Sequence, residues 1–158
     1  LDLLSASQEC GVGKNYLIQH SAGSGKSLTI AWLAHRLINL FDDKNERIYD
    51  AVIVLTDRRV LDKMLRENVR ALSPMPGIFV PTGEDGVRLK EALESNAQIV
   101  TSTIQKFPFV DGLVKQLSTK KVALIVDEAH SSQSGEFTRA VQDRLGGEDV
   151  ERIGLSNR

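Results

Sequence analysis

A short polar stretch near the start of the chain has the residue types that can hold a phosphate group. Residues 20–27 read HSAGSGKS, and the glycines at 23 and 25 let the backbone turn sharply and approach an anion closely. Backbone N–H groups at the start of a following helix can point at phosphate oxygens. Lys26 can reach the β- and γ-phosphates of a nucleotide, and the Ser27 hydroxyl can bind Mg²⁺.

The stretch departs from the usual phosphate-binding pattern, G-x-x-x-x-G-K-[ST], at its first position, where His20 replaces glycine. That position ends the preceding apolar run, so we expect a structural role for His20. A Gly/Ser loop that merely connects a strand to a helix is the alternative interpretation. The apolar run before the loop and the helical pattern after it favour a nucleotide site.

A pair of acids follows another apolar run, in the segment VALIVDEAH at 122–130. Asp127, at the carboxyl end of the expected strand, can hold Mg²⁺ directly or through water. Glu128 can act as a general base on an attacking water. Such a pair alone usually starts a helix, as its N-cap and first-turn acid. Together with the Gly-Lys-Ser loop it predicts a hydrolytic site, with His130 as a third polar group.

The elements that must position these residues follow from the hydrophobic pattern. Strand-like runs alternate with helical patterns, which predicts an α/β fold with a mainly parallel sheet and helices on both faces. Ligands of such sheets bind outside the carboxyl ends of the strands, where both polar motifs stand. Strands are expected at 16–20, 51–56, 78–82, 97–104, from 122 and at 152–156. Helices are expected at 27–41, 58–72, 87–95, 109–117 and 136–145, with a turn at 73–77.

Two of the expected helices carry apolar stripes that predict core contacts. In the helix at 27–41 the stripe comprises Leu28, Ala31, Trp32, Leu33, Leu37 and Leu40. In the helix at 58–72 it comprises Leu61, Leu65 and Leu72. The basic residues of the second helix share another face, which we interpret as solvated: Arg59, Lys63, Arg66 and Arg70.

The bulk composition predicts one soluble globular domain. The chain has 158 residues, of which 41% are hydrophobic and 26% charged, and its formal net charge is −1. That charge does not indicate a nucleic-acid partner, so such a partner must be argued from local patches. A single cysteine excludes an internal disulfide, and no apolar run approaches the ~18–20 residues that span a membrane. With no signal peptide evident, we expect a cytoplasmic protein.

The motifs in this order resemble the first RecA-like motor domain of superfamily 2 helicases and translocases. Four segments resemble more narrowly the R (motor and restriction) subunit of type I restriction-modification enzymes. They are YLIQHSAGSGKSLTIAWLAHRL, TDRRVLDKML at 56–65, TSTIQKF at 101–107 and DEAHSSQSGE at 127–136. The resemblance covers about residues 13–155. It implies ATP and Mg²⁺ as cofactors, double-stranded DNA as a partner, and a complex with methyltransferase and specificity subunits.

The resemblance also implies roles for individual residues. The ATP-binding residues would be Ala22, Gly23, Ser24, Gly25, Lys26 and Ser27, and the metal ligands Ser27 and Asp127. The catalytic set would be Lys26, Asp127, Glu128 and His130, the last linking the ATP site to a third motif. The nucleic-acid contacts would be Thr56, Arg58, Arg59, Thr101, Thr103, Gln105 and Lys106. Hydroxyls and single cations of this kind position a phosphate backbone without reading bases, which suits a translocase.

Some features of the family are not found in this sequence. Gln8 stands too close to the loop to be the glutamine that reads adenine in such motors. The third motif begins as Gly154-Leu155-Ser156 and then departs from the pattern at 157–158. We therefore expect residues 1–158 to form one RecA-like ATP-binding domain of a larger motor, with residues 1–12 as an irregular lead-in. A second motor domain and a nuclease domain are not found here.

Two functions from different classes remain open. The chain is either the motor domain of an ATP-dependent double-stranded DNA translocase, or a nucleotide- and DNA-binding module with little turnover by itself. Another DEAH-type helicase ATPase, or a P-loop ATPase or kinase outside the helicases, is a lesser alternative. An ATPase or kinase of that kind would not need the TDRR and TSTIQKF segments at consecutive strand ends.

Overall fold

A computed structural model of the chain describes residues 2–10, 15–20, 25–56, 59–72, 79–81, 91–92, 94–103, 120–127 and 150–157. Within these ranges the element order is α1 (Asp2–Cys10), β1 (Asn15–His20), α2 (Lys26–Ile38), β2 (Ala51–Thr56), α3 (Arg59–Leu72), β3 (Phe79–Pro81), β4 (Ile99–Thr103), β5 (Val122–Asp127) and β6 (Val150–Asn157).

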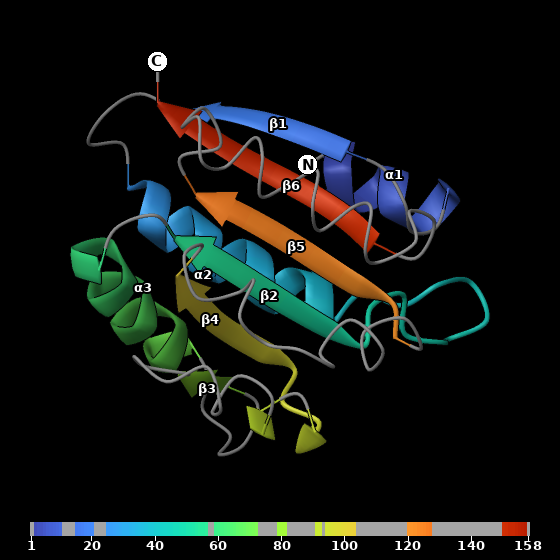
Figure 1. Ribbon diagram of the computed structural model, residues 1–158. Helices are drawn as coiled ribbons and strands as arrows, with labels where there is room; N and C mark the ends of the chain where they lie inside the picture. The colour runs from blue at the N-terminus through green and yellow to red at the C-terminus, as the bar shows by residue number, and fades with distance from the viewer. Residues whose placement is uncertain are drawn as a thin grey trace.

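The described strands form one twisted sheet of six strands in the order β1-β6-β5-β2-β4-β3 (Figure 1). Every neighbouring pair is parallel. All residues of β2, β4 and β5 are buried, as expected for β-branched and apolar runs in the middle of a covered parallel sheet. The predicted α/β fold with a parallel sheet is confirmed, and the predicted strands agree with the observed ones to within a few residues at each end.

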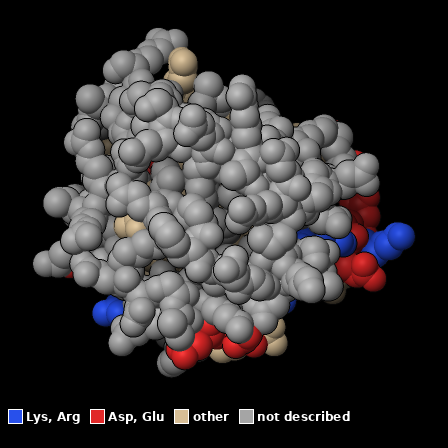
Figure 2. All heavy atoms as spheres, viewed as in Figure 1, with Lys and Arg blue, Asp and Glu red and all other residues tan. Residues whose placement is uncertain are grey.

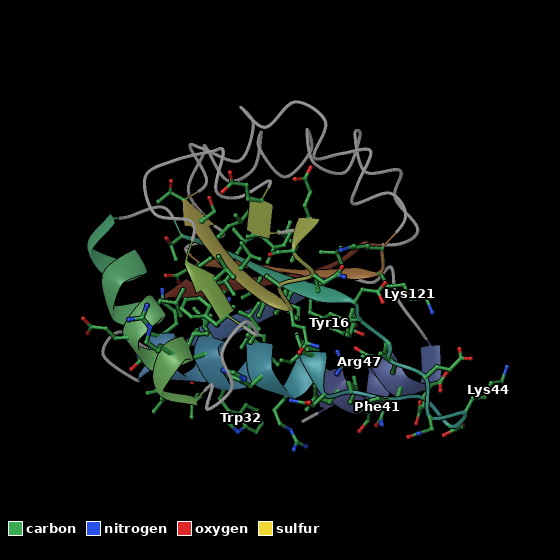
Figure 3. The ribbon with its side chains drawn as sticks, turned by 90° about the horizontal axis from the view of Figure 1, so that it is seen from below. Tyr16, Trp32, Phe41, Lys44, Arg47 and Lys121 are labelled. Carbon is green, nitrogen blue, oxygen red and sulfur yellow. The ribbon has the colours of Figure 1, made fainter. Side chains whose placement is uncertain are left out.

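The three labelled helices lie on one face of the sheet, with α1 toward the β1 edge and α3 toward β3 and β4 (Figures 1 and 3). The core between helices and sheet uses alternate residues of each strand, because successive side chains point to opposite faces. Val52 and Val54 of β2, Ala123 and Ile125 of β5, and Leu155 of β6 all join the cluster that contains the buried residues of α2. This alternation identifies which strand residues point toward α2.

Helix α1 corrects the prediction of an irregular lead-in at residues 1–12. Leu3 and Leu4 are buried, and Ser7, one helical turn further on, is buried on the same inner face of α1. The Ser7 hydroxyl donates to the Leu3 carbonyl at 2.9 Å, which satisfies a buried polar group within the helix. The helix therefore packs against the core, although its sequence offers only two leucines, Leu3 and Leu4, as large apolar residues.

The apolar stripe predicted for α2 was wrong at two residues. Leu28 is 56% exposed and Trp32 is 40% exposed, and Trp32 points away from the sheet (Figure 3). The buried residues of α2 are Ile30, Ala31, Leu33, Ala34, Leu37 and Ile38. Leu28 and Trp32 are one turn apart on the opposite side, where the Arg36 guanidinium lies 5.6 Å from the centre of the Trp32 ring.

In α3, Leu65 and Val69 are buried one turn apart, but Leu72 of the predicted stripe is exposed. The helix itself was predicted correctly. Of the helix predicted at 87–95, residues 91–92 and 94 are helical. The turn predicted at 73–77 and the helices predicted at 109–117 and 136–145 lie outside the described residues.

Acidic and basic side chains both occur on the described parts of the surface. In Figure 2 they lie at the rim of the face seen in Figure 1, with both signs close together on one side. No helix among the described residues is long and apolar enough to cross a membrane. The mixed charge of the rim is in keeping with the net charge of −1.

The packing of α2 predicts a contrast between two leucines of that helix. Leu37→Ala should lower the free energy of unfolding by about 2–5 kcal/mol, because Leu37 is fully buried and its removal leaves a cavity. Leu28→Ala should change the free energy of unfolding by less than about 0.5 kcal/mol, because Leu28 is exposed. Urea denaturation of both variants measures the difference, and equal costs would contradict this orientation of α2.

Candidate functional site

The start of α2 has the geometry of a helix that follows a tight glycine turn. Gly25 is the N-cap residue, with φ 80° and ψ 27°, a left-handed conformation that side chains disfavour. Its carbonyl accepts the first helical hydrogen bonds, from the Leu28 N–H at 2.9 Å and the Thr29 N–H at 3.1 Å. A glycine is therefore required where the chain turns from the end of β1 into α2.

The amino-terminal end of α2 is also suited to an anion. Gly25 has no side chain to cap the helix, and the first turn contains no acidic residue. The positive end of the helix dipole therefore lacks a negative side chain of its own. Backbone N–H groups at such an end are the usual binding partners of a phosphate. The residues present thus fit a phosphate group at this position.

The carboxylate at the end of β5 faces the start of α2. Lys26 Nζ lies 2.9 Å from Asp127 Oδ1, and the two side chains are 12% and 2% exposed. This ion pair joins the two motifs that the sequence places far apart. The parallel order explains the contact, since Asp127 ends its strand at the edge where α2 begins.

The ammonium group of Lys26 occupies one side of Asp127 Oδ1. A carboxylate has two oxygens with several lone-pair sites, so this one contact leaves coordination capacity. Oxygen ligands of this kind, together with a hydroxyl such as that of Ser27, are what Mg²⁺ prefers. Ser27 occupies the first turn of α2, next to Lys26. The chemistry of these side chains therefore fits a Mg²⁺ site.

Register places further polar residues beside Asp127. Leu55 pairs with Val126, so the next position along both parallel strands sets Thr56 beside Asp127. Thr56 pairs in turn with Thr103 of β4. We call Asp127, Thr56 and Thr103 the strand-end row. All three are buried, and all three point to the α2 face by the alternation of their strands.

The other neighbour of Asp127 is Leu155 of β6, which is fully buried. The expected third motif therefore lies within a strand that runs directly beside the acidic motif. Leu155 pairs with Ile18 of β1 on its other side. The candidate site is thus bounded by β6 and β1 on one side and by the strand-end row on the other.

The threonines predicted to contact nucleic acid are all buried. Thr56, Thr101 and Thr103 are 0%, 1% and 4% exposed, respectively. A nucleic-acid strand could reach these hydroxyls only if the strand ends were uncovered, so that contact stays a prediction. Arg59 begins α3 directly after the described part of β2, at the same edge of the sheet.

Several predicted site residues lie outside the described residues. From the phosphate loop these are Ala22, Gly23 and Ser24, and from the acidic motif Glu128 and His130. From the predicted nucleic-acid segments they are Arg58, Gln105 and Lys106. Their roles remain predictions.

Gln8 has a structural contact that sequence reasoning did not anticipate. Its side-chain amide Nε2 donates to the Phe41 carbonyl at 3.1 Å, which ties α1 to the segment after α2. The Phe41 ring lies 5.8 Å from the Arg47 guanidinium on the same side of the molecule (Figure 3). Gln8 therefore holds the amino-terminal helix in place.

The fold and the Lys26–Asp127 pair together define a helicase-like ATPase domain. The family model described as SWI2/SNF2 ATPase matches residues 3–155, and the chain belongs to this family. The resemblance to helicase-type motors and to R subunits that the sequence predicts is confirmed.

Relatives of known role are endonuclease subunits of type I restriction enzymes. The SauCOLORF180P subunit of Staphylococcus aureus is 30% identical over 142 residues, which are 87% of this chain and 14% of that protein. The HindI subunit of Haemophilus influenzae is 29% identical over 143 residues, 87% of this chain and 13% of that protein. The chain thus spans about one seventh of the length of these relatives.

Solved structures support the fold. The Hef helicase domain of Pyrococcus furiosus superposes with a TM-score of 0.68 at 21% identity, covering 99% of this chain and 31% of that one. The UvsW helicase of bacteriophage T4 superposes with a TM-score of 0.61 at 15% identity, covering 91% of this chain and 46% of that one. At these identities the likeness is one of fold, and it confirms the RecA-like architecture.

The buried ion pair predicts a large effect of a single charge deletion. Lys26→Ala should lower the free energy of unfolding by about 3–5 kcal/mol, because it leaves the Asp127 carboxylate buried without its cation. Adding Asp127→Asn to that variant should recover most of the loss. Thermal or urea denaturation measures both, with Lys44→Ala as the control at an exposed lysine. Strictly additive losses in the double variant would contradict the coupling.

Proposed function

We propose that the chain is the ATP-binding motor domain of an ATP-dependent double-stranded DNA translocase of the type I restriction enzyme kind. The observation that carries the proposal is the Lys26–Asp127 contact at 2.9 Å, at the carboxyl edge of a parallel sheet. It joins the lysine proposed to bind phosphate to the carboxylate proposed to bind the metal, at the start of a helix without an acidic first turn. Membership of the SWI2/SNF2 ATPase family supports ATP as the nucleotide.

In this proposal the residues of the site divide the work of hydrolysis. Gly25 and the neighbouring loop residues hold the phosphates through backbone N–H groups, and Lys26 neutralises charge on the β- and γ-phosphates. Ser27 and Asp127 hold Mg²⁺, whose positive charge lowers the cost of negative charge that develops on the phosphate oxygens. Glu128 orients the attacking water and accepts its proton, and His130 links the site to the third motif.

The DNA-facing part of the proposal rests on the ends of β2 and β4. Arg58 and Arg59 follow β2, and the segment with Gln105 and Lys106 follows β4, which lies next to β2 in the sheet. Adjacent parallel strands end at one edge, so we expect the basic residues that follow them to lie on one side of the domain. Phosphate contacts of this kind bind DNA of any sequence, which is what movement along DNA requires.

The partners in the proposal come from the relatives. A type I restriction enzyme endonuclease subunit belongs to a larger enzyme, so we infer that the whole protein works with methyltransferase and specificity subunits in the cytoplasm. The target sequence would then be read by the specificity subunit. The second candidate function is a nucleotide- and DNA-binding module with little turnover by itself. The observation in its favour is that the domain spans only 14% of the relatives' length.

The proposal predicts DNA-stimulated ATP hydrolysis that depends on two residues. Purified chain should hydrolyse ATP faster with double-stranded DNA than without it, and Lys26→Ala should abolish the activity. Glu128→Gln should lower the rate by at least about 100-fold, because it removes the general base. A coupled phosphate-release assay measures these rates, with Lys44→Ala as the unaffected control.

The outcomes separate the two candidates. Turnover that DNA stimulates and both substitutions abolish supports a self-sufficient motor. Binding of ATP with Mg²⁺, but without turnover, supports the binding module. Failure of the wild-type chain to bind nucleotide at all contradicts the site assignment.

A further inference from the structure

The strand-end row contains polar groups whose burial serves no visible structural purpose. The hydroxyl oxygens of Thr56 and Thr103 are buried and make no hydrogen bond to any residue that the structure describes. A buried hydroxyl without a partner lowers stability, because the hydrogen bonds that it loses to water are not replaced. Valine has nearly the same shape as threonine and would avoid this cost in the middle of a parallel sheet. The threonines therefore call for a functional explanation.

Thr56 differs from Thr103 in what stands beside it. The register sets Thr56 next to Asp127, whereas Thr103 is one strand further away, beyond Thr56. Neighbouring strands lie about 4.8 Å apart, so side chains in register on one face are within reach of each other. Asp127 Oδ1 is likewise buried and has Lys26 Nζ at 2.9 Å. A donor without a partner among the described residues thus stands next to a carboxylate that can accept a further hydrogen bond, on the same face.

We propose that Thr56 is a positioning residue for Asp127, whose hydroxyl donates to the carboxylate when Mg²⁺ and nucleotide take the place of the Lys26 contact. This inference rests on the proposed function, because it assumes that Asp127 holds the metal. In the structure Lys26 lies against Oδ1 and balances the carboxylate charge. When Lys26 turns to the phosphates, a donor from β2 keeps the carboxylate in one orientation. Hydrogen bonds behind a metal ligand act in this way.

This assignment gives Thr56 a role inside the domain, rather than at its DNA-facing surface. Thr56 is fully buried beside the carboxylate proposed to hold the metal, so its hydroxyl is placed to act on that carboxylate. It also explains why the hydroxyl is retained without a partner. The cost in the nucleotide-free state is offset when the metal site forms, a common trade between stability and function.

The test compares the same substitution at two positions of the row. Thr56→Val should raise the Mg²⁺ concentration needed for half-maximal tightening of ADP binding by about 10-fold, the lower end of the effect of removing a hydrogen bond behind a metal ligand. Thr103→Val removes an equally buried hydroxyl one strand further away and should leave that concentration within about twofold of wild type. Thr56→Ser keeps the hydroxyl and should restore it. Isothermal titration of ADP across a Mg²⁺ series measures binding without requiring turnover.

A second measurement distinguishes positioning from a structural role. Without nucleotide and Mg²⁺, Thr56→Val should have an unchanged or higher melting temperature, because it removes an unsatisfied buried hydroxyl. A lower melting temperature would overturn the proposal, since the hydroxyl would then have a structural partner. An unchanged Mg²⁺ requirement in Thr56→Val, or an equal shift in Thr103→Val, would also overturn it.

The same experiment also tests the proposed function, and its outcomes distinguish the failure of that function from the failure of the Thr56 inference. If the wild-type chain binds ADP equally with and without Mg²⁺, or does not bind it, the metal site and with it the role of Thr56 are both wrong. If the wild-type chain shows Mg²⁺-dependent binding that Asp127→Asn abolishes and Thr56→Val leaves unchanged, the proposed function stands and only the Thr56 inference fails.

Discussion

The register in which β5 pairs with β2 and β6 determines which residues lie beside Asp127 in the candidate site. β5 runs between β6 and β2, and all three strands point the same way, so Asp127 emerges at the edge where α2 begins. The Lys26–Asp127 contact follows from that geometry, and Leu155 and Thr56 occupy the flanking positions for the same reason. A shift of β5 by one residue would turn Asp127 to the other face and remove the contact.

The site is held in a state that is costly before ligand arrives. An ion pair that is almost completely removed from water gains little net stability, because the loss of hydration opposes the attraction. Beside it, the buried hydroxyls of Thr56 and Thr103 have no hydrogen-bond partner among the described residues. The apolar remainder of the sheet and of α2 must compensate for these groups. Polar residues retained at this cost are expected where the interior of a protein has to exchange one charged partner for another.

The sequence predicts most of the helices and strands well, but it predicts poorly which strands lie side by side. The apolar runs at 51–56 and 122–127 are long and β-branched, so their strands follow directly, and the rule for parallel sheets brings Lys26 and Asp127 to one edge. The position of Thr56 beside Asp127 is different, because β2 and β5 are distant in the chain and nothing in either segment specifies their pairing. In α1, too few apolar residues mark the helical period for the sequence to predict a helix. In α2, the apolar residues are consistent with more than one inward face, so the sequence does not show that Leu28 and Trp32 point outward.

The same geometry connects the proposed ATP site at the start of α2 with the start of α3, which follows β2. α2 begins at Lys26, and α3 begins at Arg59, shortly after Thr56. The helices pack against each other, and the His35 ring donates through Nε2 to the Val69 carbonyl at 3.1 Å. A hydrogen bond between closely packed helices resists their separate movement, so a displacement of α2 at the phosphate end is opposed unless α3 moves with it. Helix α3, which begins at Arg59, is therefore tied to the helix that begins with the lysine proposed to hold the phosphates.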